Sequence, residues 1–406
     1  MIRELHINNY KSLHDITVDV ARFNVLIGEN GCGKSNILEA IALIAATVSN
    51  KLDNEFLVSR GIRVTSPELM RSAFNTEDTQ DTQDTQDTQE PIKIKSYYEN
   101  SNIPLTYTLK NNNKAYAKWE RISDERHIDE LSKNINNFNT KQANDPKSID
   151  RLATEWHDLE KRILSRLLTT SLSSYIEAYP LIATQEDLIQ NFIIYSPENT
   201  ALRNFSNEGQ VEPLGIHGEG LLKLLKVIQK KSPEQIKQIR KSLEVFDWYS
   251  EFEIPDGILN IEEKISITDR YLSQPFDQRS ANEGFLFVLF YIALMVSDDT
   301  PKIFAIDNID VALNPKLCTK QIKELTRLAK KYNKQVFVTT HNPAILDGID
   351  LGDDDQRLLV FSRNKHGHTR YKRIKLEDKP RSSSDEELKL SEAFLRGYLG
   401  GLPKGF

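Results

Sequence analysis

The residues with the clearest capacity for chemistry form a short glycine-rich stretch near the N-terminus. It lies between an apolar run at residues 23–27 and an amphipathic run at residues 37–44, and it reads Gly28-Glu29-Asn30-Gly31-Cys32-Gly33-Lys34-Ser35-Asn36. A strand, a glycine-rich turn and a helix in this order form the context of a phosphate-binding loop. The glycines let successive backbone N–H groups point at a polyphosphate, and the helix N-terminus adds a partial positive charge.

The spacing within this loop assigns its side chains to the parts of a nucleoside triphosphate. Lys34 is expected to reach the β- and γ-phosphates, and the Ser35 hydroxyl is expected to bind Mg²⁺. The alternative is a tight strand-to-helix turn with a chance Lys-Ser pair, and the complete motif in its strand–helix context argues against it. We therefore predict that the chain binds ATP and Mg²⁺ through Asn30, Gly31, Gly33, Lys34, Ser35 and Asn36.

Composition places the chain among globular proteins with room for two or three domains. Its 406 residues are 39% hydrophobic and 28% charged, and the longest apolar run, residues 285–296, is shorter than a membrane-spanning helix. The sequence opens on a strand pattern without a leader peptide. The two cysteines, Cys32 and Cys318, lack metal-ligand spacing and indicate neither a zinc site nor a disulfide framework. We expect a cytoplasmic protein with no membrane partner.

The formal net charge of −6 argues against a globally basic nucleic-acid-binding protein. Two local stretches, Lys223 to Lys241 and Lys316 to Lys334, nevertheless carry Lys and Arg at helical spacing between apolar positions. Solvated helix faces are the simpler interpretation of both stretches.

Apolar strands alternate with helices at both ends of the chain, which indicates a parallel sheet covered on both faces. Near the N-terminus, strands are expected at residues 2–7, 16–20 and 23–27, followed by a helix to about Val48. Toward the C-terminus, the pattern predicts strands at 191–197, 302–307, 335–341 and 357–361, and helices at 221–228, 233–246, 285–296 and 317–332.

The middle of the chain interrupts this alternation. Four Asp-Thr-Gln repeats between Asp78 and Gln89 contain no apolar residue and predict a surface loop. Strand patterns at 92–98 and 105–109 predict an antiparallel hairpin arm, and the region from about Arg121 to Tyr179 has a helical pattern without a heptad repeat. Two further short strands are expected at 258–261 and 265–267.

Two late strands end in residues that could complete a triphosphate site. Asp307 closes one apolar strand, in the place where a Walker B carboxylate holds the water shell of Mg²⁺ opposite the P-loop serine. His341 ends the next strand, where it could sense the γ-phosphate. A simple turn cap beside Asn342 and Pro343 is the alternative for His341.

Together these features resemble the ATP-binding-cassette ATPases of the SMC, RecF and OLD branch. The resemblance rests on the P-loop, the late Walker B strand, the switch Thr339-Thr340-His341-Asn342-Pro343 and the opening turn Asn9-Tyr10-Lys11-Ser12-Leu13. It implies an α/β P-loop NTPase of the ABC-head type, with a mixed sheet flanked by helices, an antiparallel β arm and a helical insertion. The implied parts are the N-terminal half of the head (1–115), the insertion (116–190), the C-terminal half (191–380) and a tail (381–406).

The resemblance also implies that a second subunit completes the site. In this branch, the loop that begins the helix before Walker B contacts the nucleotide of a partner, and Ala281-Asn282-Glu283-Gly284 takes that place here. Asn282 and Gly284 are therefore expected to bind the partner's nucleotide. The segment from Leu214 to Leu221 resembles a lid-region motif, in which His217 and Glu219 are expected to cap the helix beginning at Gly220; a further site near the nucleotide is the alternative.

Two departures from the family pattern bear on hydrolysis. Asn308 follows Asp307, where the family has the glutamate that orients the attacking water, and an amide cannot act as a general base. Asn282 stands where the family has the signature serine. Asp310 could supply a substitute carboxylate, or could be an ordinary surface residue of the loop. With Asp307, Asn308 and His341 at the reacting end, we expect intact ATP binding and slow or conditional hydrolysis.

The resemblance favours an ATP-driven switch that forms a homodimer or a higher homo-oligomer. Small ATPases of this branch are similar to the ATPase components of bacterial anti-phage systems, which act with a separately encoded nuclease or toxin. One alternative is a RecF-like ATPase for DNA maintenance that binds DNA directly. The other is a pseudo-ATPase scaffold, which Asn308 leaves as an alternative because it replaces the water-orienting glutamate.

Overall fold

The computed structural model describes most of the chain, namely residues 1–74, 90–99, 101, 104–114, 117–122, 183–204, 213–254, 264–380 and 387–402. The Asp-Thr-Gln repeat, most of the expected helical insertion, the strand expected at 258–261 and parts of the tail lie outside these residues. The domain boundaries given above therefore remain a prediction. Within the described residues, no helix is long and apolar enough to cross a membrane.

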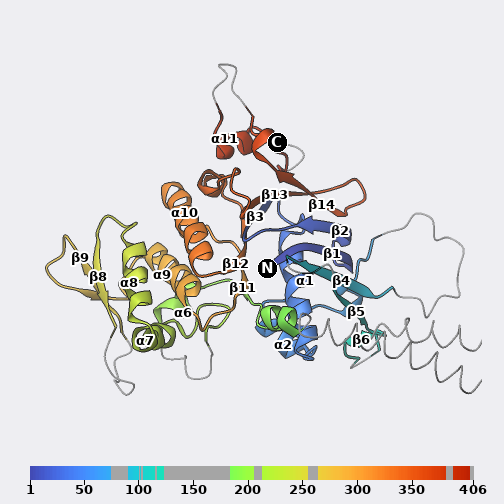
Figure 1. Ribbon diagram of the computed structural model, residues 1–406, viewed down its shortest axis with the longest axis horizontal. Helices are drawn as coiled ribbons and strands as arrows, with labels where there is room; N and C mark the ends of the chain where they lie inside the picture. The colour runs from blue at the N-terminus through green and yellow to red at the C-terminus, as the bar shows by residue number, and fades with distance from the viewer. Residues whose placement is uncertain are drawn as a thin grey trace, which may run out of the picture.

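A six-stranded sheet in the centre of the molecule joins strands from both ends of the chain (Figure 1). All adjacent pairs are parallel except the antiparallel β13–β14 pair. The carboxyl ends of β3, β11 and β12 therefore meet at one edge, which brings the P-loop, Asp307 and His341 together. The strand order is β14 (Thr369–Ile374), β13 (Gln356–Arg363), β3 (Phe23–Gly28), β12 (Gln335–Thr340), β11 (Ile303–Ile306) and β7 (Ile194–Tyr195).

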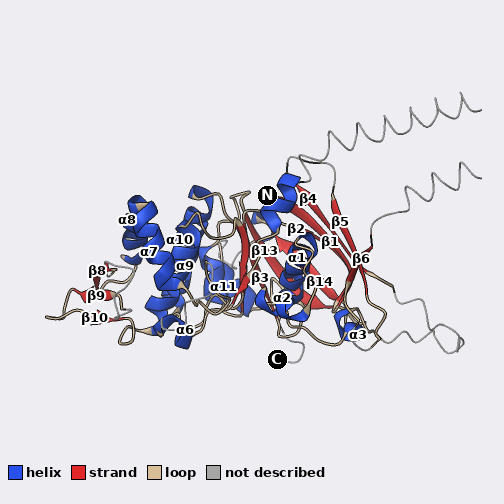
Figure 2. Ribbon diagram, turned by 90° about the horizontal axis from the view of Figure 1, so that it is seen from below, coloured by secondary structure: helices blue, strands red, loops and turns tan. Residues whose placement is uncertain are grey.

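Helix α1 (Lys34–Val48) lies between the central sheet and a second, antiparallel sheet (Figure 2). Most of its residues are buried, which explains its run of Ala, Ile and Leu with few polar positions. The predicted hairpin pairs with the first strand of the chain and so extends the N-terminal strands into a five-stranded sheet. This sheet has the order β2 (Leu13–Asp19), β1 (Ile2–Tyr10), β4 (Ile92–Tyr98), β5 (Leu105–Lys110) and β6 (Glu120–Ile122), and α2 (Asn54–Ser59) and α3 (Pro67–Met70) lie nearby in sequence.

Helices cover the opposite side of the central sheet and form a helical lobe. At its centre lies α9 (Glu283–Val296), which is apolar all round and buried from Gly284 onward, as a helix enclosed by other elements must be. The Asn282 side chain caps its N-terminus by accepting a hydrogen bond from the Phe285 N–H. Around α9 lie α6 (Asn199–Arg203), α7 (Leu221–Lys231), α8 (Pro233–Leu243) and α10 (Pro315–Lys331), with a small sheet of β8 (Tyr249–Glu253), β9 (Ser266–Asp269) and β10 (Phe276–Asp277) at the far end.

The structure confirms the strands and helices predicted on either side of the P-loop, Walker B and the switch. The apolar pattern did not predict β14, because most residues of this edge strand are polar: its sequence is Thr-Arg-Tyr-Lys-Arg-Ile. It also missed β8, and the short α11 (Leu390–Leu395), which packs on the 3₁₀ turn η2 (Pro343–Gly348) after the switch. These elements are short or border the sheet, where apolar periodicity is weak.

A buried lysine ties the start of β12 to the loop before β11. Lys334 has no exposed surface, and its ammonium donates to the carbonyl oxygens of Ser297, Thr300 and Pro301 and to the Thr300 hydroxyl at 2.7–3.2 Å. Both strands, β11 and β12, end at the edge of the sheet where the P-loop, Asp307 and His341 meet. Burial lowers the pKa of Lys334 to about 7, which is well below the ordinary value of a lysine in an unfolded chain.

This depressed pKa predicts a pH-dependent stability. Between the folded-state and unfolded-state pKa values the unfolded chain binds more protons, so the free energy of unfolding must rise with pH in that window. We expect the wild type to gain about 3 kcal/mol over a Lys334→Met variant between about pH 7 and pH 9.5. Denaturant unfolding at both pH values measures this. Lys330→Met, at an exposed position of α10, should show no such change, and an equal change there would contradict the assignment to Lys334.

Candidate nucleotide-binding site

The loop between β3 and α1 has the backbone of a phosphate-binding loop. Gly31 and Gly33 have φ values of 75° and 106°, and α1 begins directly after them. Gly33 could not be replaced, because a Cβ there would lie 2.2 Å from Thr369 Oγ1 in addition to the unfavourable φ. The first turn of α1 therefore presents its free N–H groups to the space above the loop, as anion binding requires.

Lys34 is folded back over this loop. Its side chain is 6% exposed, and Nζ donates to the carbonyl oxygens of Gly28 and Glu29, both at 2.9 Å. Burial lowers the pKa of Lys34, and the electrostatic effects of Cys32 and Asp307 oppose part of this decrease. Exchange of these two carbonyl acceptors for phosphate oxygens would give the ammonium stronger, charge-assisted hydrogen bonds. Cys32 is completely buried beneath the loop and acts as a small filler.

The Walker B carboxylate lies beside the P-loop serine. Asp307 follows β11 directly, and Ser35 Oγ donates to its two carboxylate oxygens at 3.3 and 3.4 Å. Thr339, buried in β12, also donates a hydrogen bond to Asp307 and so fixes the carboxylate. Hydroxyl and carboxylate oxygens, together with water and phosphate oxygens, are the ligands that Mg²⁺ prefers. The residues present therefore fit Mg²⁺, with Ser35 and Asp307 as its protein partners.

Asn308 adopts a left-handed backbone conformation next to this carboxylate. Its φ is 55°, and its N–H donates to Thr339 Oγ1 at 2.8 Å. Asparagine tolerates this conformation better than most residues, and the side chain lines the cavity where a triphosphate would end. Asp310, the alternative carboxylate, accepts a hydrogen bond from Thr340 at 2.6 Å and does not line this cavity.

His341 follows β12 and lines the same cavity on the side of the switch strand. Burial and the charge of Lys34 lower its pKa, against the opposing effects of Asp310 and Asp307. The His341 imidazole is therefore neutral near pH 7. It can form a hydrogen bond with a phosphate oxygen or a water without adding a positive charge to the cavity.

The cavity has a volume of about 380 Å³ and gathers the predicted P-loop, Walker B and switch residues. Asn30, Gly31, Gly33, Lys34, Ser35, Asn36, Asp307, Asn308 and His341 all line it. Asn282 and Gly284 do not. Asn282 is exposed at the start of α9, and Gly284 packs so closely on the loop after Walker B that a Cβ would lie 2.9 Å from the Ala312 carbonyl oxygen.

Sequence reasoning missed three residues of this cavity, Arg63, Thr339 and Arg363. Arg63 belongs to a segment without a readable pattern, and Arg363 ends β13, far away in sequence. Thr339 offered a signal, because it belongs to the Thr-Thr-His run that marked the switch.

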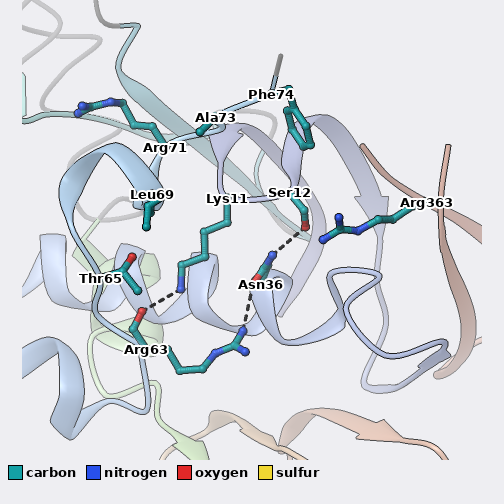
Figure 3. A pocket seen from close by; sticks show the side chains of 10 residues that line it. All are labelled: Lys11, Ser12, Asn36, Arg63, Thr65, Leu69, Arg71, Ala73, Phe74 and Arg363. Atoms are coloured by element: carbon teal, nitrogen blue, oxygen red, sulfur yellow. Dashed lines mark hydrogen bonds between the residues drawn. The ribbon is translucent and has the colours of Figure 1, made fainter. Parts of the chain in front are cut away.

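A second cavity of about 390 Å³ adjoins the first and shares Asn36, Arg63 and Arg363 with it (Figure 3). A P-loop cradles the phosphates at the start of its helix, and this second cavity could receive the ribose and base of a nucleotide whose phosphates lie in the first. Guanidinium planes and aromatic rings can stack on a nucleobase, and this second cavity is surrounded by four cationic side chains and one aromatic ring. They are Lys11, Arg63, Arg71, Arg363 and Phe74.

A buried carboxylate in α1 orients the residues between the two cavities. Glu39 is 1% exposed and forms ion pairs with Lys11 and with Arg63, the latter at 2.5 Å, and it accepts a hydrogen bond from the Tyr10 hydroxyl at 3.2 Å. A buried carboxylate is tolerated because it is paired in this way. Arg63 in turn donates to Asn36 Oδ1 at 3.1 Å. Glu39 thus connects the turn at Tyr10 and Lys11 to the nucleotide cavity.

The β13–β14 hairpin holds the P-loop from the other side. Arg363 Nε donates to the Gly31 carbonyl oxygen, and Thr369 Oγ1 donates to the Cys32 carbonyl oxygen, both at 2.8 Å. Thr369 also shares a hydrogen bond of 2.7 Å with Ser12. The loop is therefore fixed by strands from both ends of the chain.

The expected cap of α7 by His217 and Glu219 is wrong. The N-cap of α7 is Gly220, in a left-handed conformation without a side-chain hydrogen bond. Glu219 instead accepts from the His217 N–H at 3.1 Å, and the His217 ring contacts the Ser196 carbonyl oxygen and Glu198 at 3.2 Å. These residues brace their own turn against the segment after β7, and neither lines the nucleotide cavity.

Sequence and structure comparisons are consistent with this geometry. The "DNA replication and repair protein RecF" of Limosilactobacillus reuteri (strain DSM 20016) is 39% identical over 56 residues, which are 14% of this chain and 15% of that protein. The RecF protein of Limosilactobacillus fermentum is 44% identical over 52 residues, 13% of this chain and 14% of that protein. The chain thus matches only about a seventh of these relatives' length.

A solved structure similar to the whole chain is the "SmcHead bound to the C-winged helix domain of ScpA", which is 12% identical with a TM-score of 0.50 and covers 93% of this chain and 98% of that one. At this identity the likeness shows the fold, an ABC-type P-loop ATPase head. A family model described as "AAA domain, putative AbiEii toxin, Type IV TA system" matches residues 23–347, from the P-loop strand to beyond the His341 switch. The chain therefore belongs to this AAA_21 family of SMC- and RecF-like ABC ATPases.

Proposed function

We propose that this ATPase is a nucleotide-dependent dimerising switch, the ATPase component of a bacterial anti-phage system that controls a separate nuclease or toxin. One observation carries the switch: the cavity unites P-loop, Mg²⁺-binding and switch residues, while Asn282 lies outside it, exposed at the start of α9. A second subunit would bring its own Asn282 and Gly284 to the open side of the triphosphate. ATP then holds two heads together, and its loss releases them.

Asn308 supports a switch that stays closed for long periods. Without a carboxylate at this position, no general base faces the γ-phosphate from Walker B. The side chain can still orient a water, so hydrolysis is slow and is open to control by a partner. Lys34 and Ser35 would hold the phosphates and Mg²⁺, which neutralise the charge that develops on the transferred phosphoryl group.

The proposed effector rests on the family and on the fold. The family description names a toxin of a type IV toxin–antitoxin system, and the similar SMC head was solved with a ScpA domain bound to it. The bound ScpA domain supports an ATPase that works on a second protein, and the family description links this family to a toxin–antitoxin system. The neighbouring open reading frame tests this assignment, because a nuclease-like or toxin-like gene is expected there.

The dimer is tested by mixing two variants that fail for different reasons. Lys34→Ala loses its own phosphate contacts, whereas Asn282→Asp keeps the α9 cap and places a carboxylate against the partner's triphosphate. We expect each variant alone to stay monomeric with ATP and Mg²⁺, and a mixture to form dimers through one intact composite site. Sedimentation or light scattering measures this. Dimerisation of Asn282→Asp alone, or a wild-type mass that ATP does not change, would contradict the proposal.

A RecF-like role in DNA maintenance is the second candidate, and the local identity to RecF proteins favours it. The two roles differ in their partner. A RecF-like protein needs DNA for its cellular function, whereas a defence switch needs its effector. If the protein is a defence switch, deletion of the neighbouring gene should remove phage resistance and leave the survival of DNA damage unchanged.

A further inference from the structure

The Tyr291 side chain in α9 carries a buried hydroxyl without a hydrogen-bond partner among the described residues. The residue has no exposed surface, and its hydroxyl oxygen makes no hydrogen bond within the part of the chain that the structure describes. A buried polar group that lacks a partner costs free energy, so nearly all such groups in proteins are paired. The Tyr291 hydroxyl therefore needs a specific explanation.

The charge of Asp310 acts on this hydroxyl. Tyr291 follows Gly284 by about two helical turns, so both lie on the same face of α9. Gly284 packs against the loop after Walker B, where a Cβ on it would lie 2.9 Å from the Ala312 carbonyl oxygen. Burial raises the pKa of the Tyr291 hydroxyl, and Asp310 and Cys318 raise it further. A carboxylate that can accept a hydrogen bond thus lies near an unpaired donor.

In this structure the Asp310 carboxylate is bonded to the switch. Thr340 Oγ1 donates a hydrogen bond to it at 2.6 Å. The same hydroxyl accepts a hydrogen bond from the Asn342 N–H at 3.0 Å, and Asn342 Nδ2 donates to Cys318 Sγ of α10 at 3.5 Å. Because Thr340 directly precedes His341, Asp310 holds the end of β12 that carries His341.

The loop that carries Asp310 is strained on both sides of the carboxylate. Asn308 and Ala312 have φ values of 55° and 62°, in the left-handed region that costs free energy for a residue with a Cβ. Such strain is common in segments that switch between two arrangements. The loop begins at Asp307, which lies beside Ser35 where Mg²⁺ would bind. A bound nucleotide would therefore act directly on the strained loop.

We infer that Tyr291 is a positioning residue for ATP hydrolysis, and that its hydroxyl takes over Asp310 from Thr340 when ATP and Mg²⁺ are bound. Transfer of the carboxylate releases Thr340, and with it the end of β12, so that His341 can approach the γ-phosphate. The partly buried Asp310 keeps a hydrogen-bond donor throughout, as a carboxylate in the interior requires. Tyr291 acts through Asp310, since it does not line the nucleotide cavity. This role rests on hydrolysis at the proposed site and is independent of the proposed dimer and effector.

The test removes this hydroxyl alone from the full-length protein. Tyr291→Phe keeps the ring and its packing, and Tyr195→Phe is the matched control. Tyr195 is also fully buried, lies in β7 beside the Walker B strand, and has an unpaired hydroxyl among the described residues. The charged group that acts on it is Arg60, which cannot accept a hydrogen bond. Phosphate release over a range of ATP concentrations with Mg²⁺ separates kcat from KM, and thermal unfolding measures the stability of each variant.

We expect Tyr291→Phe to lower kcat about tenfold, because one hydrogen bond to a charged group is lost in the reacting arrangement. Its KM for ATP should stay within about twofold of the wild-type value, since the phosphate contacts are intact. The Tyr195→Phe control should match the wild type in both constants. Neither variant should lose stability, because neither hydroxyl has a partner in the described part of the chain.

An Asp310→Asn background tests whether the hydroxyl acts through this carboxylate. In that background, Tyr291→Phe should lower kcat by no more than about twofold. An unchanged kcat in Tyr291→Phe, an equal loss in Tyr195→Phe or a full further loss in the Asp310→Asn background would overturn the inference. A wild type that binds ATP but releases no phosphate would also overturn it, and would leave the nucleotide-binding site in place.

Discussion

Replacement of Lys34 by alanine is expected to lower the affinity for ATP at least about a hundredfold. The ammonium now donates to the Gly28 and Glu29 carbonyl oxygens, and it would exchange these neutral acceptors for charged phosphate oxygens. Hydrogen bonds to charged groups contribute about 1.5–3 kcal/mol each, and about 2.7 kcal/mol corresponds to a hundredfold in Kd. Alanine removes both the charge and the donors.

Calorimetric titration of ATP in the presence of Mg²⁺ measures this loss. Lys51→Ala serves as the control, because Lys51 is an exposed lysine beyond the far end of α1. Its affinity should equal that of the wild type. A Lys34→Ala protein whose Kd for ATP lies within threefold of the wild-type value would show that the P-loop does not bind ATP. It would also contradict the dimer proposal.

Replacement of Asn308 by glutamate is expected to raise the rate of ATP hydrolysis. The wild type should turn over far below the ordinary enzyme range of about 10 s⁻¹. A carboxylate at this position would lie in the cavity beside Asp307, and a correctly placed general base contributes about 10²–10⁴ in rate. We expect an increase of about a hundredfold in kcat, measured as phosphate release at saturating ATP and Mg²⁺.

Asn308→Gln separates general-base catalysis from side-chain size. Glutamine has the length of glutamate without its basicity, so the Gln variant should remain as slow as the wild type. Both variants must adopt the φ of 55° that asparagine tolerates, and this strain costs each of them about 1 kcal/mol of stability. Equal rates in the two variants, or a fast wild type without any partner, would show that Asn308 does not limit hydrolysis.

The sequence predicted best those parts of the site that are local. Lys34 and Ser35 follow their strand directly, and Asp307 and His341 each close an apolar strand, so strand-end position and residue type together indicated the site. The parallel sheet then placed these ends at one edge. The family resemblance, and not a sequence pattern, assigned Asn282 to a partner's site, and the structure places it outside the cavity, exposed at the start of α9.

The sequence could not predict contacts that depend on three-dimensional pairing. Arg63 reaches the cavity through an ion pair with Glu39, and no sequence pattern connects an arginine in an irregular segment to a glutamate in a helix. Arg363 meets Gly31 across more than three hundred residues of chain. The cap expected from His217 and Glu219 failed because both side chains found partners within their own turn or after β7.

The position of β3 between β12 and β13 has a consequence for biosynthesis. The P-loop strand is translated early, but its neighbours in the sheet, Gln335–Thr340 and Gln356–Arg363, emerge some three hundred residues later. Contacts between such distant segments are slow to form, because the loop-closure entropy must be overcome first. At about 5–20 residues per second, the nascent chain carries an unpaired P-loop strand for many seconds. The nucleotide site can therefore form only after Gln335–Thr340 and Gln356–Arg363 have left the ribosome, so a shorter nascent chain lacks this site.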